Sequence, residues 1–329
     1  MQIGNHSIPN RLILAPMAGI TDAPFRATCQ RLGAGLAVSE MISADPRLRF
    51  TTKTRRRTAP WPGADLTAIQ IVGAEPRQLA QAAAVAEQSG APIIDINLGC
   101  PAKKVCRRQA GSALLRDEGL VGQILEAVVA AVEVPVTLKI RTGWDPASRN
   151  AVRIAKMAED VGVAALTVHG RTRACGFRGQ AEYQTIRNVK QAIGIPVIAN
   201  GDIDTPEKAR AVLAATGADA LMIGRGAQGN PWIFREISHF LQSGERMDPP
   251  GLDEVAAVLT ELMQDFYLFY GERTGVRMAR KHLSWSCRRL PNGGKLWDQI
   301  KRVESATGQL RMTREFFSSQ TMYSNRQAA

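Results

Sequence analysis

The sequence contains few cysteines, and their spacing matches neither a disulfide framework nor a zinc site. Among its 329 residues are five cysteines, an odd number, and no two of them form a CxxC pair. Such usage is typical of proteins that work in a reducing compartment. We therefore expect a cytoplasmic protein with no structural disulfide and no bound metal.

Long hydrophobic runs are also missing. No uninterrupted apolar segment approaches the roughly 20 residues that a membrane-spanning helix needs. The first residues, 1–6, lack the basic start and apolar stretch of a secretory signal. These absences predict a protein that does not associate with membranes.

Acidic residues are outnumbered by basic ones. The chain carries 42 Lys and Arg against 30 Asp and Glu, a formal net charge of +12. A surplus of this size suggests a polyanionic partner. The length favours one large and one small domain, and the 45% hydrophobic content is that of a globular protein.

Short apolar runs bounded by turn residues alternate with helical patterns along most of the chain. We expect eight strands, at 10–15, 36–39, 67–71, 91–97, 136–140, 165–169, 196–199 and 220–223. Helices are expected at 23–32, 76–89, 151–155 and 205–215, and an irregular segment is expected between the second and third strands. This alternation predicts a parallel α/β protein, and eight is the number of strands that closes a (β/α)₈ TIM barrel. A doubly wound open sheet is the alternative, but its GxGxxG fingerprint is missing after the first strand.

Polar residues interrupt the predicted strands in a regular way. In a closed parallel barrel, inward side chains near the carboxyl ends of the strands line the active site. Alternation with apolar neighbours places five polar residues inward, namely Gln70, Asn97, Lys139, His169 and Asn200. A buried lysine is costly unless it meets an anion or a strong acceptor. The five together predict a polar site in the mouth of the barrel.

The fourth strand leads directly into a cysteine. Gly99 and Pro101 break the strand and leave Cys100 on a fixed turn at its carboxyl end. A thiol there could act as a nucleophile, a metal ligand or a proton donor. The alternative is a small buried side chain without chemistry, since free cysteine often packs as a hydrophobe.

Glycine-bearing turns follow the last two strands, at 200–202 and 224–226. Turns after strands seven and eight of a TIM barrel commonly bind a phosphate through backbone N–H groups. Arg225 adds a positive charge suited to a bidentate phosphate contact. These turns predict a phosphorylated cofactor.

After a linker near 243–251, two amphipathic helical patterns follow, and the region is basic. Residues 271–315 hold eleven Lys and Arg against four Asp and Glu, so this region carries a net +7 of the chain's +12. We expect residues 1–243 to form the barrel and residues 244–329 to form a small helical domain. Its cations, together with Trp285, favour contact with a nucleic-acid backbone.

The order of short motifs resembles one family in particular. The chain is similar to the bacterial tRNA-dihydrouridine synthases, most of all to their B subgroup. The matching segments span the whole barrel and lie at 15–19, 97–101, 139–141, 169–173, 200–203 and 224–232. The tail matches less sharply but has the family's helical, basic character.

The resemblance implies an enzyme in which FMN, reduced by NADPH, reduces the C5–C6 double bond of selected tRNA uridines. Cys100 would be the general acid that gives a proton to C5. The residues implied to contact FMN are Pro16, Met17, Ala18, Gln70, Lys139, His169, Asn200, Gly201, Asp202, Gly224 and Arg225. Those expected to contact the substrate are Asn97, Arg141, Arg277, Arg280, Arg288 and Arg289. We expect a monomer whose partners are tRNA and NADPH.

Two other functions stay open at this point. An FMN barrel of the dihydroorotate dehydrogenase kind, acting on a free pyrimidine, would need the same flavin residues but no basic tail. An RNA-binding protein with a vestigial barrel would need no intact set of Gln70, Cys100, Lys139 and His169. Cys106, six residues after Cys100, raises the further possibility that the two thiols pair on oxidation.

Overall fold

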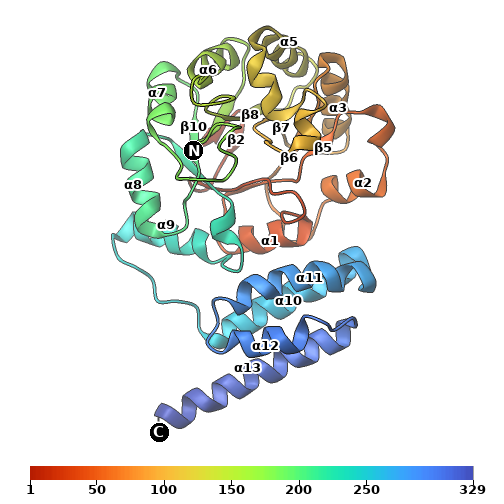
Figure 1. Cartoon of the computed structure of the whole chain (residues 1–329), viewed down its shortest axis with the longest axis vertical. Helices are drawn as coiled ribbons and strands as arrows, with labels where there is room; N and C mark the ends of the chain where they lie inside the picture. Colours follow the sequence, from red (N-terminus) through yellow and green to blue (C-terminus); the bar gives the residue numbers. More distant parts are fainter. Residues whose placement is uncertain (329) are drawn as a thin grey trace.

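Eight parallel strands close into a barrel surrounded by helices (Figure 1). The computed structural model describes residues 1–328, with side chains up to residue 320; residue 329, the end of the expected second domain, lies outside the described part. The barrel strands are β3 (Leu12–Leu14), β4 (Leu36–Val38), β6 (Thr67–Val72), β7 (Ile93–Leu98), β8 (Val136–Arg141), β9 (Ala165–His169), β10 (Val197–Asn200) and β11 (Ala220–Ile223). Pairing of β4 with β6 and of β11 with β3 closes the ring, so the predicted TIM barrel is confirmed.

Side-chain alternation along the strands separates two cores. On β3, Leu12 and Leu14 pack outward against the helices, whereas Ile13 packs inside the barrel. A short hairpin of β1 (Gln2–Ile3) and β2 (His6–Ser7) covers the amino-terminal end, where Ile3 joins the inner cluster. The inner core therefore fills the bottom of the barrel and leaves its carboxyl end for polar residues.

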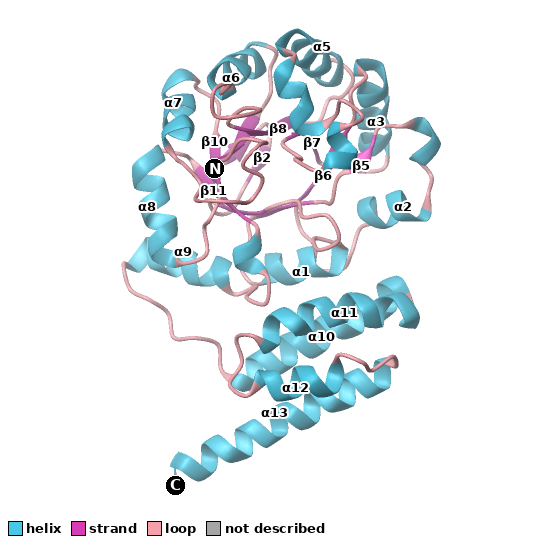
Figure 2. Ribbon diagram, in the orientation of Figure 1, coloured by secondary structure: helices cyan, strands magenta, loops and turns pink. Residues whose placement is uncertain are grey.

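Helices cover the outside of the barrel (Figure 2). They are α1 (Ala23–Arg31), α2 (Thr52–Thr58), α3 (Pro76–Gln88), α4 (Lys103–Cys106), α5 (Glu118–Val129), α6 (Ala151–Asp160), α7 (Gln184–Ala192), α8 (Pro206–Thr216) and α9 (Ile233–Ser243). Short 3₁₀ helices are η1 (Pro46–Leu48), η2 (Gly111–Arg116) and η3 (Arg225–Ala227), and the two-residue strand β5 (Ile42–Ser43) extends β6.

Several segments differ from the sequence-based expectation, among them the helices α5 and α7, which were not predicted. The stretch between β4 and β6, expected to be irregular, contains α2. Thr51 caps this helix by accepting from the Thr54 N–H, and none of its residues is buried. Because α2 has no apolar face, its sequence lacks the hydrophobic periodicity that predicts a helix.

The tail is a bundle of four helices below the barrel in Figure 1. They are α10 (Leu252–Tyr270), α11 (Glu272–Cys287), α12 (Gly293–Ile300) and α13 (Ala306–Ala328). The tail is docked on α1, where the ring of His282 lies 4.7 Å from that of Phe25 and the Tyr270 hydroxyl donates to Asp22 Oδ2 at 2.9 Å. The boundary at 243/244 falls where α9 ends, and the division into two domains stays a prediction.

Within the described part of the chain, no helix is both long enough and apolar enough to span a bilayer.

Candidate active site

A cavity of about 1170 Å³ opens at the carboxyl ends of the strands. All five predicted inward polar residues line it, together with the thiol-bearing turn. The predicted site residues on its wall are Pro16, Met17, Ala18, Gln70, Asn97, Cys100, Lys139, Arg141, His169, Asn200, Gly201, Asp202, Gly224, Arg225 and Arg289. The remaining three, Arg277, Arg280 and Arg288, lie on the tail away from the cavity wall.

A chain of buried hydrogen bonds leads from β6 to Cys100. Gln70 Nε2 donates to Asp95 Oδ2 at 2.7 Å, and Asn97 Nδ2 donates to Gln70 Oε1 at 2.7 Å. Asn97 Oδ1 accepts from the backbone N–H groups of Gly99 and Cys100, at 3.1 and 2.9 Å. The amides of Gln70 and Asn97 are thereby fixed in orientation, and the turn that carries Cys100 is held from the strand before it.

Cys100 is half-buried, and its surroundings keep the thiol protonated. Burial is the main cause that raises its pKa above the ordinary value, and the neighbouring Cys106 adds to the rise. Its carbonyl accepts from the Ser112 N–H at 3.1 Å, and the Cys106 thiol lies 3.6 Å from the same oxygen. A protonated thiol in a fixed turn can act as a proton donor at neutral pH.

On the neighbouring strand β8, the half-buried Lys139 has a hydrogen-bond acceptor. Lys139 Nζ donates to Asn200 Oδ1 at 3.0 Å, and Asn200 Nδ2 donates to the Met222 carbonyl at 2.7 Å. Burial lowers the pKa of Lys139 to about 8. The same cause, followed by the charge of Lys139, lowers the pKa of His169 far below its ordinary value, so this imidazole is neutral at pH 7.

The turns after β10 and β11 meet at one side of the mouth. Asp202 bridges two arginines, accepting from Arg171 Nη2 at 2.6 Å and from Arg225 Nη2 at 2.9 Å. Gly201 has φ +128°, and a Cβ there would lie 2.7 Å from the Cβ of Ala181. Only glycine fits this turn. Arg225 is left half-exposed at the edge of the mouth.

Arg141 is buried and joins two loops of the mouth. Its Nε donates to the Gly99 carbonyl at 2.8 Å, and its Nη1 donates to the carbonyls of Thr172 and Gly176. Its guanidinium also lies 5.3 Å from the ring centre of Phe177, which is 58% exposed at the mouth. Arg141 thus holds the Cys100 turn against the loop after β9.

The tail arginines differ in their surroundings. Arg277 and Arg288 are exposed, and Arg289 reaches the cavity wall. Arg280 is half-buried and donates to the Val303 carbonyl at 2.8 Å, so it holds α11 to the segment before α13. Lys281, a tail cation that was not predicted as a site residue, donates from its Nζ to the Gly19 carbonyl at 3.3 Å.

Two further residues of the mouth escaped prediction, Arg171 and Phe177. Arg171 follows His169 within a polar motif, and this neighbourhood was the available signal. Phe177 gives no signal by itself, because an aromatic residue in a loop usually belongs to the core. Among the described residues, no group of three or more His, Cys, Asp or Glu side chains could hold a metal ion.

The fold and the cavity define a (β/α)₈-barrel protein with a cationic mouth and, on neighbouring strands, one thiol and a half-buried lysine. The barrel alone is also found in the solved structure of the old yellow enzyme homologue from Zymomonas mobilis. That structure matches with a TM-score of 0.54 at 16% identity, over 75% of this chain and 92% of the other. At this identity the match concerns the fold.

The family follows from the sequence. A family model described as dihydrouridine synthase matches residues 13–321, and the chain belongs to this family. The tRNA-dihydrouridine synthase B of Pseudomonas aeruginosa is 55% identical over 318 residues, which cover 97% of this chain and 96% of that protein. The protein of the same description in Pectobacterium carotovorum is 55% identical over 324 residues, or 97% of this chain and 99% of its own.

Proposed function

We propose that this chain is a tRNA-dihydrouridine synthase, which uses FMN and NADPH to reduce the C5–C6 double bond of uridines in tRNA. The observation that carries the proposal is the placement of the Cys100 thiol, held through the hydrogen bond of its backbone N–H to Asn97, in the same cavity as Lys139. High identity to named B-type synthases over the full length of both chains supports the same activity.

The residues present fit FMN. The turn at Gly201 has no side chain and admits none, so its backbone N–H groups can approach a phosphate. Arg225 supplies a positive charge at the same edge of the mouth. Pro16, Met17 and Ala18 would lie against the ring, and Gln70, fixed by Asp95, would bond its edge. Asp202 would act through Arg225, because a carboxylate repels a phosphate.

When bound, FMN would supply the hydride for one carbon of the uracil double bond. Lys139, with a pKa of about 8, is mostly charged at pH 7 and would stabilise negative charge at the ring edge beside it. Neutral His169 would contribute a hydrogen bond without adding a further charge.

Cys100 would supply the proton for the other carbon. Its thiol holds this proton at neutral pH because burial raises its pKa. Asn97 and Arg141 keep the thiol in place through the backbone of the turn, so we assign both to the substrate side of the cavity. The target uridine has to leave its stack to reach this depth.

A direct test separates this function from the reduction of a free pyrimidine. Purified protein is reduced with NADPH without oxygen and mixed rapidly with tRNA that lacks dihydrouridine, with uracil or with orotate. We expect reoxidation of the flavin absorbance and new dihydrouridine with tRNA alone. Turnover of orotate without tRNA would support the dihydroorotate dehydrogenase alternative, and a colourless protein that binds tRNA would support the non-enzymatic one.

A further inference from the structure

We propose that a cationic rim on the barrel, across the mouth from the tail, is a second tRNA-backbone surface. The rim is defined here as Lys103, Lys104, Arg107, Arg108 and Arg116, together with Trp144 and Arg173. The inference rests on the proposed function and extends it, since sequence analysis placed RNA binding on the tail.

The charge of the rim comes from one short segment. Residues 101–116 contain five cations and no Asp or Glu. All five are exposed, and none forms an ion pair in the part of the chain that the structure describes. The charge of Arg108 is a minor cause of the lowered pKa of Asp45. An exposed cluster without internal partners is suited to a run of phosphates.

The rim segment is attached to the proposed general acid. It folds back so that the Cys100 carbonyl accepts from the Ser112 N–H at 3.1 Å. Gly111 has φ +61°, and a Cβ there would lie 2.9 Å from the same carbonyl oxygen. Cys106 ends α4 with its thiol on this oxygen as well. A phosphate bound on the rim would therefore lie at a fixed distance from the Cys100 thiol.

Trp144 extends the rim to the cavity. The guanidinium carbon of Arg116 lies 4.8 Å from the Trp144 ring centre, and that of Arg173 lies 4.4 Å from it. The Arg173 N–H donates to the Gly143 carbonyl, and the Ala174 N–H donates to the Trp144 carbonyl. The indole thus orders two cations by stacking, and Arg116 stays exposed beside it.

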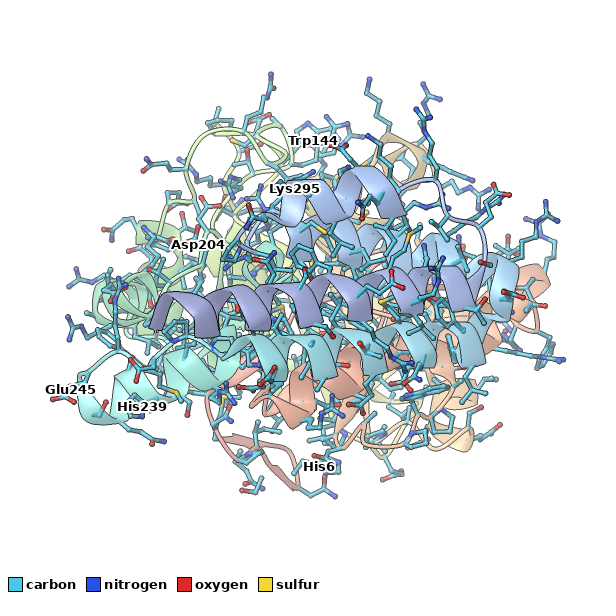
Figure 3. All side chains as sticks on the ribbon, turned by 90° about the horizontal axis from the view of Figure 1, so that it is seen from below. His6, Trp144, Asp204, His239, Glu245 and Lys295 are labelled. Atoms are coloured by element: carbon cyan, nitrogen blue, oxygen red, sulfur yellow. The ribbon has the colours of Figure 1, made fainter. Side chains whose placement is uncertain are left out.

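Rim and tail lie on the same face of the molecule. Lys103, Arg173 and Arg178 line the cavity from the rim side, and Arg289 lines it from the tail. Figure 3 shows Trp144 of the barrel and Lys295 of α12 at the same edge of the molecule, whereas His6 lies at the opposite edge. A tRNA bound to the tail can therefore reach the rim by crossing the mouth.

In the other basic cluster of the barrel, at residues 53–57, two of the four cations are used internally. Arg57 pairs with Glu40 at 2.9 Å, and Arg56 stacks on the Tyr270 ring, 5.1 Å from its centre. These contacts hold α2 to the barrel and to the tail. Of the five cations at 101–116, by contrast, only Arg116 contacts a ring, that of Trp144, and none forms an ion pair, within the residues that the structure describes.

The test is the salt dependence of tRNA binding by the full-length FMN-loaded protein. The rim variant is Lys104→Ala/Arg107→Ala/Arg116→Ala, none of which lines the cavity. Its affinity should fall at least about 10-fold at 150 mM salt, and the slope of log K against log salt should flatten by about two. The matched control is Arg11→Ala/Lys156→Ala/Arg187→Ala, which removes three exposed cations elsewhere on the barrel and should bind like wild type.

Equal slopes in the rim and control variants would overturn the proposal. If Arg116→Ala impairs folding, the pair Lys104→Ala/Arg107→Ala carries the same test with a slope change of about one to two. Dihydrouridine formation by the wild type is measured separately. If the wild type forms no dihydrouridine but the rim variant still weakens tRNA binding, the enzymatic function is rejected and the rim remains a tRNA-binding surface.

Discussion

At the residue scale, Cys100 is defined by what holds its backbone. Asn97 accepts from the N–H of its turn, and Arg141 binds the carbonyl of the preceding glycine. The side chain is hydrogen-bonded to the backbone of Ala102 and lines the cavity. A thiol restrained in this way is positioned to donate a proton.

Cys100→Ala should separate the two half-reactions. We expect the variant to bind FMN, oxidise NADPH and bind tRNA, because none of these needs the thiol. The transfer step to tRNA should slow by about 10²–10⁴-fold, the range for a positioned general acid. Stopped-flow mixing of the pre-reduced variant with unmodified tRNA measures this step.

Cys175→Ala is the matched control, since this half-buried thiol lies in the neighbouring loop and does not line the cavity. It should transfer at the wild-type rate. Reoxidation of Cys100→Ala by tRNA as fast as wild type would exclude Cys100 as the acid and leave its turn a purely structural role.

Cofactor retention should depend on Arg225 and, less strongly, on Lys139. Arg225→Ala removes the exposed charge beside the turns proposed to bind the phosphate, and Lys139→Ala removes a cation from the proposed edge of the flavin ring. Flavin content per protein, read from absorbance after purification, should drop several-fold in Arg225→Ala, by analogy with the ~1.5–3 kcal/mol of a charge-assisted hydrogen bond. Full flavin content in both variants, with unchanged thermal unfolding, would show that these assignments are wrong.

At the element scale, the contact between α1 and α10 joins the tail to the barrel through a buried acid. Asp22 caps α1 by accepting from the Phe25 N–H at 3.2 Å and accepts from Tyr270 of α10. Beside it, His282 packs between Phe25 and Phe266, and burial lowers the pKa of His282 to about 3. Both groups are therefore uncharged over part of the neutral range.

Asp22→Asn should change how stability depends on pH. Burial raises the pKa of Asp22 to about 7, so between pH 4 and 7 the folded carboxyl keeps a proton that the unfolded chain has lost. The free energy of unfolding of wild type should therefore fall with rising pH over this window, relative to Asp22→Asn. Asparagine still caps the helix, and the difference should be on the order of 1 kcal/mol or more.

Urea unfolding at intervals from pH 4 to 8 gives the comparison. Parallel curves for wild type and Asp22→Asn would mean that Asp22 is ionised in the folded protein throughout this range. Tyr270→Phe, which removes one hydrogen bond to the carboxylate, should move the wild-type transition to higher pH.

Much of the barrel could be predicted from the sequence because each strand is short, apolar and followed by a turn. The alternation of polar and apolar residues along the strands was sufficient to predict that Gln70, Lys139 and His169 line one cavity. The helix α2 was not predictable from periodicity because it buries no residue, and the two-residue strands are too short to form a pattern.

The connections within the site were beyond the sequence. The series of hydrogen bonds from Asp95 to Cys100 depends on which neighbour each side-chain amide contacts. The register of the strands determines those contacts. Arg288 is exposed, whereas Arg280 is half-buried and donates to the Val303 carbonyl. This difference depends on how α11 packs. Spacing in the sequence assigns both to the same basic face.

At the scale of the whole molecule, two groups of exposed cations lie around one opening. The tail contributes Arg277 and Arg288, both exposed, and the barrel contributes the rim. The other end of the barrel, which the β1–β2 hairpin covers, contains the apolar inner cluster. This arrangement favours a long polyanion that crosses the mouth over a small free pyrimidine.

The tail and the rim should therefore contribute independently to tRNA affinity. Arg277→Ala/Arg288→Ala should weaken binding about 5- to 20-fold near 150 mM salt and flatten the salt slope by one to two, as expected for lost phosphate contacts. Combined with the rim variant, its effect on log K should add, because the two groups share no side-chain contact. Arg280→Ala is the contrasting control: it should lower the thermal stability of the tail through the lost bond to Val303, with little change in salt slope. Titration of labelled tRNA across 50–300 mM salt reads all four proteins. A combined variant no weaker than either parent would mean that tRNA engages only one of the two groups at a time.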